Sequence, residues 1–402
     1  MTAELKKYKA ELEQELKNIL DYWIKNTIDE VNGGFVGRID HLGNVHNNAP
    51  KGAVLSARIL WTFSAAYNLT REPVYLNIAA RAFQYIRDYI VDKEYGGVYW
   101  SVDHKGKPLE TEKEIYALSF AVYGLSEYAR ASGNESAKKL AIEVYRDIVK
   151  HSYDSKNGGY IEGFARDWKE IPEQRLGPGN TGVKKTMNTH LHLLEAFSNL
   201  LAVSHDKELF EKVKELVNIF LGRIVSGQTH HLILFFDEEW KEKSKIISYG
   251  HDIEAAWLIL EASDKLESEP LLKKVKTVSI EITKAAAKGL DGDGGMWYEY
   301  DVDKQHLLRE KHWWPQAEAM VGFFNAWEIS KDEKYLNQSL KSWDFVKQYL
   351  LDKKIGEWYS GVREDHSPIP NADKVGIWKC PYHNGRACIE LIKRINLNLD
   401  IK

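Results

Sequence analysis

The sequence is poor in cysteine and has no long apolar run. Only Cys380 and Cys388 occur among its 402 residues, which is too few for the disulfide framework of a small secreted domain. No apolar stretch is long enough to cross a bilayer, and the polar start of the chain has no signal-peptide core. We therefore expect a cytoplasmic protein that is not attached to a membrane.

The chain also lacks a marked excess of charge of either sign. It has 55 Lys and Arg residues against 59 Asp and Glu residues, and the two kinds are interspersed. Nucleic acids and anionic membranes are bound through clustered positive charge, so we expect neither as a partner. The 13 tryptophans and 21 tyrosines instead favour a neutral ligand such as a sugar, on which aromatic rings can stack. We expect a monomer.

Glycine-containing turns followed by an aromatic residue recur about every sixty residues. They occur at Gly33-Gly34-Phe35, Gly96-Gly97, Gly158-Gly159-Tyr160, Gly294-Gly295 and Gly356-Glu357-Trp358. The spacing predicts a degenerate sixth copy around Phe236 to Trp240. Between successive turns lie two stretches with apolar residues at three- and four-residue spacing, which is typical of amphipathic helices. The sequence therefore predicts six helical hairpins.

The periodicity places twelve helices along the chain. Their predicted ranges are 3–27, 52–70, 73–91, 113–131, 135–150, 183–203, 207–222, 250–265, 269–288, 313–329, 332–350 and 380–395. A tandem array whose ends meet closes into a ring, with one helix of each pair inside and one outside. We predict an all-α protein, an (α/α)6 barrel that forms one domain over residues 1–402; an open helical solenoid is the alternative.

Loops of two kinds alternate along the chain. Those at 69–73 and 330–332 are short, whereas those that carry the glycine turns are long. Long loops gathered at one end of a scaffold commonly build binding sites. We expect the helix after each long loop to be the inner one, with its N-terminus facing that end.

The first turns of the six predicted inner helices all carry residues that are typical of active sites. They are Arg58; Tyr116; Asn188, His190 and His192; His251, Glu254 and Trp257; Trp313, Trp314 and Glu318; and Trp378, Tyr382, His383 and Arg386. Chance could produce one or two such clusters, but six at equivalent places around a ring indicate a single pocket. His190 lies two residues from His192, on another helical face, so we expect it to pack in the interior.

Two prolines mark helix starts near these residues. Pro315 and Pro381 suit the first helical position. This placement would put Glu318 and His383 in the first turns of their helices, near the positive end of the helix dipole. Such ends would favour an anionic intermediate.

Metal ligation by the histidines and Glu254 is chemically feasible, but the sequence has no short-range ligand pair such as H-E-x-x-H. The run from Asp291 to Gly295 faintly resembles a calcium loop, yet Val302 stands where such a loop needs its last glutamate. There is also no nucleotide-binding glycine loop. We therefore expect neither a metal nor another cofactor.

Histidines, an arginine, an assisting carboxylate and stacking tryptophans suit proton abstraction next to a carbonyl group. The carbon acid is weak, so the reaction needs a base of near-neutral pKa and cationic or N–H donors on the developing enediolate. A carbon centre is most easily inverted with one base on each face of the planar intermediate. Two histidines from separate helices would meet that need.

Four segments resemble the cellobiose 2-epimerases, a group within the N-acylglucosamine 2-epimerase family. These segments are MNTHLHLLEA, SYGHDIEAAW, WWPQAEA and WKCPYHNGRA, and the resemblance extends along nearly the whole chain. It implies the same (α/α)6 barrel and a reversible, cofactor-free epimerisation at carbon 2 of the reducing-end glucose of β-1,4-linked disaccharides, through a cis-enediolate. Cellobiose would give glucosyl-mannose and lactose would give epilactose; disaccharides derived from manno-oligosaccharides are implied as well.

The resemblance also implies roles for five catalytic residues. His251 and His383 would exchange the carbon 2 proton, and Glu254 would polarise and orient His251. His192 would shuttle protons between the ring oxygen and oxygen 1 as the sugar ring opens and closes. Arg58 would hold the enediolate oxygens.

Six further residues are implied to contact the substrate. They are Tyr116 and Asn188 as sugar contacts, Trp314 and Trp378 as stacking platforms for the two rings, Trp257 as a wall of the reducing-end subsite, and Glu318 as a ligand of hydroxyl groups.

Three alternatives stay open. An N-acylglucosamine 2-epimerase, or a mannose 2-epimerase or aldose-ketose isomerase, would share the family, although residues 379–386 favour the disaccharide enzymes. An inverting glycosidase would need two carboxylates on opposite sides of the scissile bond, and Glu254 and Glu318 are the available pair. A sugar-binding protein without turnover is the third alternative.

Overall fold

Twelve α-helices make up most of the computed structural model, which describes residues 2–171, 175 and 182–400. In this part of the chain the helices are α1 (Thr2–Thr27), α2 (Ala53–Thr70), α3 (Pro73–Tyr85), α4 (Ile115–Ser132), α5 (Glu135–Ser152), α6 (Met187–Ser204), α7 (Lys207–Ile219), α8 (Tyr249–Asp264), α9 (Glu269–Ala286), α10 (Trp313–Ser330), α11 (Glu333–Phe345) and α12 (Tyr382–Asp400).

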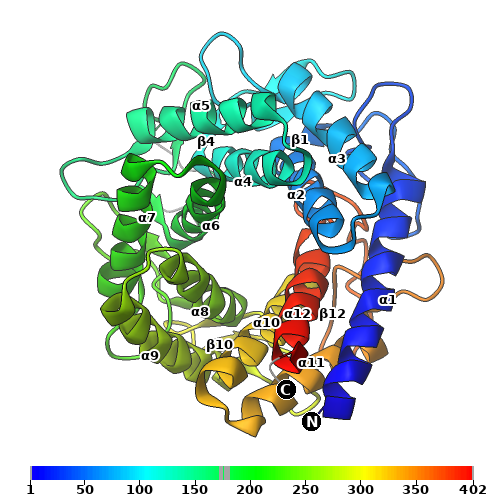
Figure 1. Cartoon of the computed structure of the whole chain (residues 1–402), viewed down its shortest axis with the longest axis vertical. Coiled ribbons are helices and arrows are strands. Elements are labelled where there is room, and N and C mark those ends of the chain that lie inside the picture. The colour runs from blue at the N-terminus through cyan, green and yellow to red at the C-terminus, as the bar shows by residue number, and fades with distance from the viewer. Residues whose placement is uncertain (1, 172–174, 176–181, 401–402) are drawn as a thin grey trace.

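The helices form two concentric rings (Figure 1). The even-numbered helices make the inner ring and the odd-numbered helices make the outer ring. Each inner helix contacts the next one along the chain, and α12 packs against α2, so the ring closes. Helix α1 completes the outer ring beside α12. The predicted (α/α)6 barrel is confirmed, and the open solenoid is wrong.

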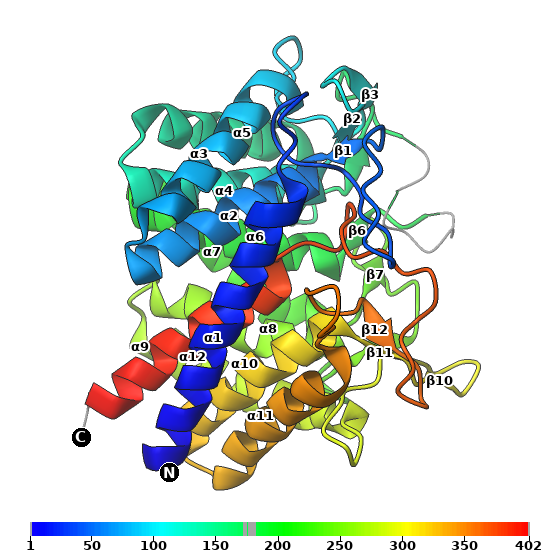
Figure 2. The ribbon, with the colours of Figure 1, turned by 90° about the vertical axis from the view of Figure 1, so that its right-hand side faces the viewer.

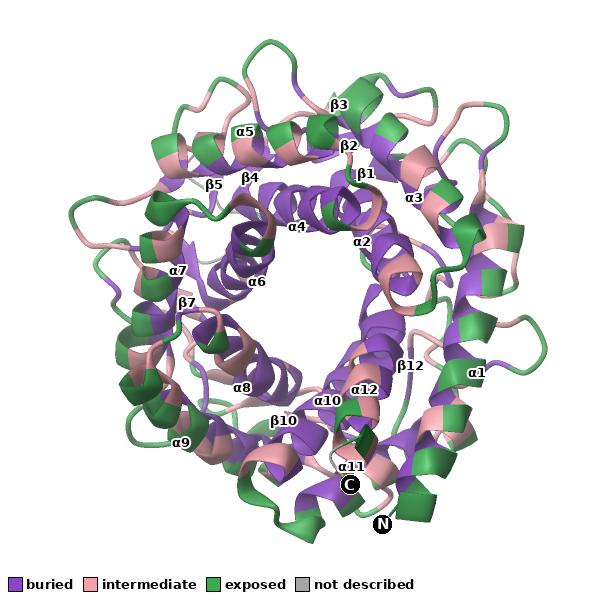
Figure 3. Cartoon of the chain, in the orientation of Figure 1, coloured by how far each residue is buried: buried purple, intermediate pink, exposed green. Residues whose placement is uncertain are grey.

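Inner and outer helices differ in how much of their circumference is buried. Helix α4 is buried at every residue from Ile115 to Ala129, whereas α5 buries a single stripe that includes Ala137, Ala141 and Val144. Figure 3 shows the same contrast around the whole barrel. A helix enclosed on all sides needs apolar or small residues all round, while a surface helix needs only one apolar face. No helix in the described ranges is both long and apolar enough to span a membrane.

Several outer helices end in a turn that is π-helical or 3-10 instead of α-helical. Helices α3, α7 and α11 run into the π-helical turns η1 (Ile86–Ile90), η2 (Phe220–Ile224) and η4 (Val346–Leu350), and α9 ends in the 3-10 turn η3 (Ala287–Gly289). The predicted ends at 91, 222, 288 and 350 fall at or beside these turns. The largest discrepancies are at α6, which was predicted to begin at residue 183, and at α12, which was predicted to end at residue 395.

Short antiparallel strands gather with the long loops at one end of the barrel (Figure 2). They are β1 (Lys51–Gly52), β2 (Ser101–Val102), β3 (Pro108–Glu110), β4 (Lys113–Glu114), β5 (Gly163–Phe164), β6 (Lys185–Thr186), β7 (Phe235–Phe236), β8 (Ile246–Ser248), β9 (Glu299–Asp301), β10 (His306–Leu308), β11 (Lys311–His312) and β12 (Gly361–Val362). The sheets have the orders β1-β2-β3, β8-β9-β10, β4-β5, β6-β7 and β11-β12.

These strands tie the N-termini of neighbouring inner helices together. Strands β1, β4, β6, β8 and β11 end one residue before α2, α4, α6, α8 and α10, and each pairs with a strand in the next long loop. Helices α2, α4 and α6 therefore begin later than predicted, because the residues before them are extended and hydrogen-bonded to the following repeat. Helix α8 begins one residue earlier than predicted, and α10 begins where it was predicted.

The glycine turns are closed by β-bridges, and the sixth copy is not where it was predicted. The bridges join Ile28 to Phe35, Val91 to Val98, Tyr153 to Tyr160, Val225 to Leu232, Leu290 to Met296 and Leu351 to Trp358. The degenerate turn is thus at 225–232, whereas Phe236 bridges Glu242 in the hairpin that follows. His230 takes the left-handed conformation there, with φ of 61°. Because the other copies have glycine at this point, the repeat was hidden.

In most of these turns a buried lysine forms an ion pair with an aspartate of the turn. The Nζ atom of Lys51 donates to the Asp29 carboxylate and to the Gly33 carbonyl, both at 2.7 Å. Equivalent ion pairs join Lys113 to Asp92, Lys185 to Asp154, Lys311 to Asp291 and Asp293, and Lys374 to Asp352. The carboxylates that resembled a calcium loop therefore bind a lysine.

Candidate active site

A cavity of about 350 Å³ is built from the N-terminal turns of all six inner helices. Its lining consists of Arg58, Tyr116, Asn188, His192, His251, Glu254, Tyr298, His312, Trp313, Trp314, Trp378 and His383. Nine of the eleven predicted site residues are in this set. The structure thus brings together side chains that are more than 300 residues apart in the sequence, such as Arg58 and His383.

His383 is held by a carboxylate. Its Nδ1 atom lies 2.7 Å from Oε1 of Glu318. This bond fixes the imidazole ring and leaves Nε2 as the nitrogen that can exchange a proton with a ligand in the cavity. Trp314 contacts both His383 and His251, with ring centroids 5.7 and 4.6 Å apart. The two imidazoles are therefore close enough to face one sugar.

His251 is held differently from the prediction. Its Nδ1 atom lies 2.8 Å from the Ser248 hydroxyl, and the described residues include no hydrogen bond between His251 and Glu254. Oε1 of Glu254 instead accepts from Nη2 of Arg386 at 2.5 Å. A guanidinium is a stronger donor to a carboxylate than a neutral imidazole, so the glutamate turns toward Arg386 although it shares a helical face with His251.

His192 and Arg58 complete the polar wall. Nδ1 of His192 lies 3.1 Å from Oε2 of Glu195. Nη2 of Arg58 donates to the Tyr116 hydroxyl at 2.8 Å, and its guanidinium lies 4.2 Å from the centre of the Phe120 ring. Arg58 has no carboxylate partner among the described residues. Its positive charge is therefore available to an anionic oxygen of a ligand.

Burial makes three of the cavity histidines, His192, His251 and His383, weak bases. Desolvation lowers the pKa of His251 to about 3, and the charge of His192 adds to this effect. Desolvation also lowers the pKa of His192 and of His383, and Arg58 and Arg386 lower both further. All three imidazoles are therefore neutral at pH 7 and able to accept a proton.

The nearby carboxylates differ in protonation. Burial and the neighbouring Glu318 raise the pKa of Glu254 to about 8, so this group carries a proton at pH 7. Burial also raises the pKa of Glu318. At Glu195, Arg386 and His192 outweigh burial and lower the pKa to about 2. Of the three groups, Glu254 is the one that lines the cavity, and its proton lets it donate a hydrogen bond there.

Glu318 and Trp257 lie behind the cavity wall, which differs from the prediction that both touch the sugar. Each is 1% exposed, and neither lines the cavity. Oε2 of Glu318 accepts from the Trp257 indole at 3.1 Å, while Oε1 is bonded to His383. These contacts use the groups that were expected to bind hydroxyls, so both residues support the wall.

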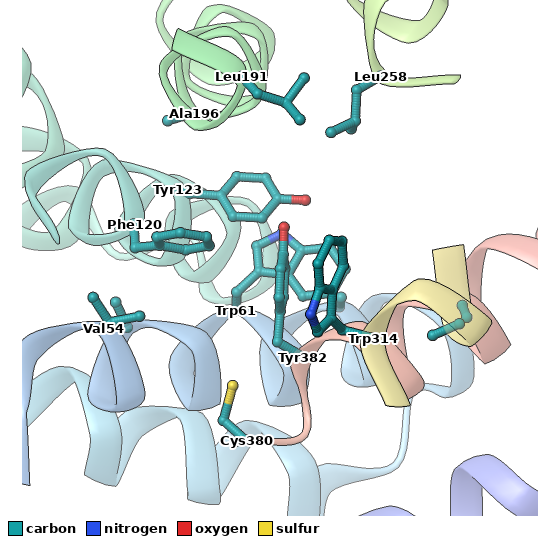
Figure 4. Close-up of a cluster of buried hydrophobic side chains, with 14 of the residues drawn as sticks. Val54, Trp61, Phe120, Tyr123, Leu191, Ala196, Leu258, Trp314, Cys380 and Tyr382 are labelled. Atoms are coloured by element: carbon teal, nitrogen blue, oxygen red, sulfur yellow. The ribbon is translucent and has the colours of Figure 1, made fainter. Parts of the chain in front are cut away.

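Aromatic rings form most of the rest of the lining, together with Asn188. Trp314 belongs to a cluster of buried side chains that also includes Trp61 and Tyr382 (Figure 4), and Tyr382 lies edge-on to Trp61 with centroids 5.5 Å apart. Trp378 is 41% exposed at the cavity mouth. Flat apolar faces of this kind suit the C–H faces of a sugar.

Sequence reasoning missed four residues that build the site. Tyr298 and His312 line the cavity and stack on each other with centroids 4.1 Å apart. They lie outside any predicted helix, so helical spacing could not reveal them. Glu195 and Ser248 could have been found, because each is three residues from the histidine that it contacts.

The local predictions for His190 and the prolines had different outcomes. His190 is fully buried and bonded to the carbonyl of Thr186 and the N–H of Tyr160, as expected for a packing residue. Pro315 is the third residue of α10, and Pro381 precedes α12, so neither holds the predicted first position. Both still lie where a missing N–H costs no helical hydrogen bond.

One group of side chains has the composition of a metal site. Ligand atoms of Glu254, Glu318 and His383 all lie within 4.8 Å of one another. However, Arg386 donates to both carboxylates, and His383 Nδ1 is bonded to Glu318. A cation at this point would have to displace a guanidinium, so the residues present fit an internal ion-pair network better than a metal.

Comparison with known proteins agrees with this geometry. A family model described as N-acylglucosamine 2-epimerase matches residues 33–386. A cellobiose 2-epimerase of Bacteroides fragilis is 45% identical over 385 residues, covering 96% of this chain and 98% of the relative. The structure of cellobiose 2-epimerase from Bacillus thermoamylovorans has a TM-score of 0.93 at 38% identity, covering 97% of this chain and 100% of that one. That from Spirochaeta thermophila has the same score and identity, covering 99% and 98%. This chain therefore belongs to the N-acylglucosamine 2-epimerase family.

Proposed function

We propose that this protein is a cellobiose 2-epimerase, which inverts carbon 2 of the reducing-end glucose of β-1,4-linked disaccharides. The observation that carries the proposal is the placement of two imidazoles, His251 and His383, against one indole in a cavity that also holds Arg58. The names of the relatives, which are 38–45% identical over nearly the whole chain, supply the substrate class.

The reaction follows from the cavity groups. With the sugar ring open, one imidazole removes the carbon 2 proton, and the electron pair moves into a carbon 1–carbon 2 double bond as the carbonyl becomes an enediolate. The Arg58 guanidinium stabilises the charge on the enediolate oxygens. The second imidazole enters this step protonated on Nε2 and gives that proton to the opposite face of carbon 2, which inverts the centre, while the proton held by the first imidazole is released to solvent. His192 moves the protons of ring opening and closure. Return of a proton to carbon 1 instead would give the ketose from the same intermediate.

Glu254 acts as a neutral acid that donates a hydrogen bond to a sugar oxygen. Its pKa of about 8 predicts that kcat/KM falls as the pH rises through 8, because the donor proton is then lost. Glu254→Gln keeps an N–H donor that does not titrate. We expect the basic decline to be absent from the pH profile of this variant. A basic limb that is the same in both proteins would contradict the role.

Trp314 stacks on the sugar. We expect Trp314→Ala to raise KM for cellobiose roughly 5- to 150-fold, the equivalent of about 1–3 kcal/mol of stacking. Trp314→Phe is the matched control, because it keeps an aromatic face and should lose much less. Steady-state kinetics would decide this, and an unchanged KM in the alanine variant would exclude the stacking role.

The cavity disfavours an inverting glycosidase. Such an enzyme needs carboxyl groups about 6.5–9.5 Å apart across the scissile bond. Here Glu254 and Glu318 bind the same nitrogen of Arg386, and Glu318 does not line the cavity. Release of glucose from cellobiose would nevertheless show that the protein is a glycosidase.

The proposal is tested by incubating the protein with cellobiose in heavy water. We expect glucosyl-mannose with deuterium at carbon 2, detected by NMR. Lactose, mannose and N-acetylglucosamine assayed in parallel separate the family alternatives. Turnover confined to a monosaccharide would overturn the disaccharide assignment, and no carbon 2 exchange with any of these sugars would favour a binding protein.

A further inference from the structure

Arg386 is a buried cation surrounded by three carboxylates from three different inner helices. Nη1 donates to Glu195 of α6, and Nη2 donates to Glu254 of α8 at 2.5 Å and to Glu318 of α10 at 2.7 Å. The side chain is 1% exposed, and its guanidinium lies 4.3 and 4.8 Å from the ring centres of Tyr382 and Trp257.

Two of these carboxylates are the partners of cavity histidines. Glu195 contacts Nδ1 of His192, and Glu318 contacts Nδ1 of His383. One glutamate therefore links the Arg386 guanidinium to each of the two imidazoles, although Arg386 itself does not line the cavity. It cannot touch a ligand there without rearrangement.

Ionisation of more than one of these carboxyl groups would be unfavourable without this cation, because burial and the charge of Glu195 raise the pKa of both Glu254 and Glu318. Removing one member of a buried ion-pair network leaves uncompensated charge in a low-dielectric interior. The planar guanidinium also offers five N–H donors in a fixed fork, which lets it hold several carboxylates in defined directions. A lysine keeps the charge but is a compact ammonium group on a flexible chain, so it cannot hold three acceptors in the same directions.

We propose that Arg386 is a positioning residue that couples the Glu195–His192 and Glu318–His383 pairs, so that one buried guanidinium sets the orientation of both imidazoles. The catalytic meaning of this coupling rests on the proposed function, whereas the orientation itself does not. Displacement of one carboxylate is transmitted through the shared guanidinium to the other.

The chain offers a matched control on the same helix. Arg394 lies two turns beyond Arg386 in α12, 6.0 Å from the centre of the Trp257 ring. It donates to Glu328 at 2.6 Å and to Asn325 at 3.2 Å, and neither contacts a cavity histidine. Arg394→Lys therefore perturbs a half-buried arginine–carboxylate pair on the same helix without touching the proposed coupling.

The experiment compares Arg386→Lys with Arg394→Lys in the full-length protein. Ring N–H signals of ¹⁵N-labelled histidine report the Nδ1–H bonds of His192 and His383 without any substrate. We expect both signals to shift or vanish in Arg386→Lys and to stay unchanged in Arg394→Lys. With any sugar that the wild type turns over, we expect kcat to fall about 10- to 100-fold in Arg386→Lys, by analogy with residues that orient metal ligands, and KM to change less than about twofold.

A second pair of variants keeps the test decisive if Arg386→Lys does not fold. Glu195→Gln leaves Arg386 in place and shares no hydrogen bond with His383 in the described residues. We expect it to shift the His383 ring signal through Arg386, whereas Glu328→Gln should not. If the His383 signal is unmoved in Glu195→Gln, or if Arg386→Lys behaves like Arg394→Lys, the coupling is wrong. Failure of the wild type to act on cellobiose would instead overturn the proposed function and leave the NMR result standing.

Discussion

Replacement of His383 by asparagine is expected to lower kcat/KM for epimerisation by about 10²- to 10⁴-fold, the range for loss of a general base. The imidazole lies in the cavity with its Nδ1 atom bonded to Glu318. An asparagine amide can still donate to that carboxylate, which avoids a buried charge without a partner. It has no nitrogen that accepts a proton at neutral pH.

Isotope exchange at carbon 2 tests this role more specifically than a loss of activity does. In a two-base reaction, the variant keeps one base, so it should still exchange the carbon 2 hydrogen of one epimer with heavy water while failing to convert it. In this variant, the glucose-ended and mannose-ended disaccharides should therefore differ in whether their carbon 2 hydrogen exchanges with heavy water. A melting temperature close to that of the wild type serves as the folding control. Epimerisation at the wild-type rate would exclude His383 as a base.

His251→Asn is expected to cause a loss of similar size, about 10²- to 10⁴-fold, with the opposite exchange pattern. Nδ1 of His251 is bonded to the Ser248 hydroxyl, and an amide can keep that bond. If the two histidines serve opposite faces, the epimer that exchanges in His251→Asn is the one that does not exchange in His383→Asn.

The two variants together test the central geometry. Exchange of the same epimer in both would mean that the imidazoles do not bracket the intermediate, despite their shared contact with Trp314. Exchange of neither epimer in either variant would mean that the two residues act as one unit. Ser248→Ala is a useful companion to His251→Asn, because it removes the orienting hydroxyl and leaves the base in place.

The periodic features of the fold could be predicted from the sequence. Helix identity, the six hairpins and the inner position of every second helix follow from apolar spacing and from the recurring turns, both of which are local along the chain. The predicted position of one turn was wrong because the residues there differ from those of the other repeats, and the predicted starts of some inner helices were wrong as well. His230 replaced glycine in the fourth turn along the chain, and strand residues before α2, α4 and α6 were counted as helix.

The candidate site was predicted as a set of residues but not as a network. Convergence of the inner helix starts placed nine of the predicted side chains in one cavity. The partners of those side chains were harder to predict, because each carboxylate had several donors within reach. Glu254 turned to Arg386, which is 132 residues away, rather than to His251 on its own helix.

The sequence by itself therefore determined the ring of helices and the chemical types that face its axis, because both depend on spacing along one chain. Only the tertiary structure decided which carboxylate holds which histidine and that Glu318 and Trp257 lie behind the wall. That choice depends on competition among hydrogen-bonding groups from four different helices, in a buried space where each acceptor binds the strongest donor that it can reach.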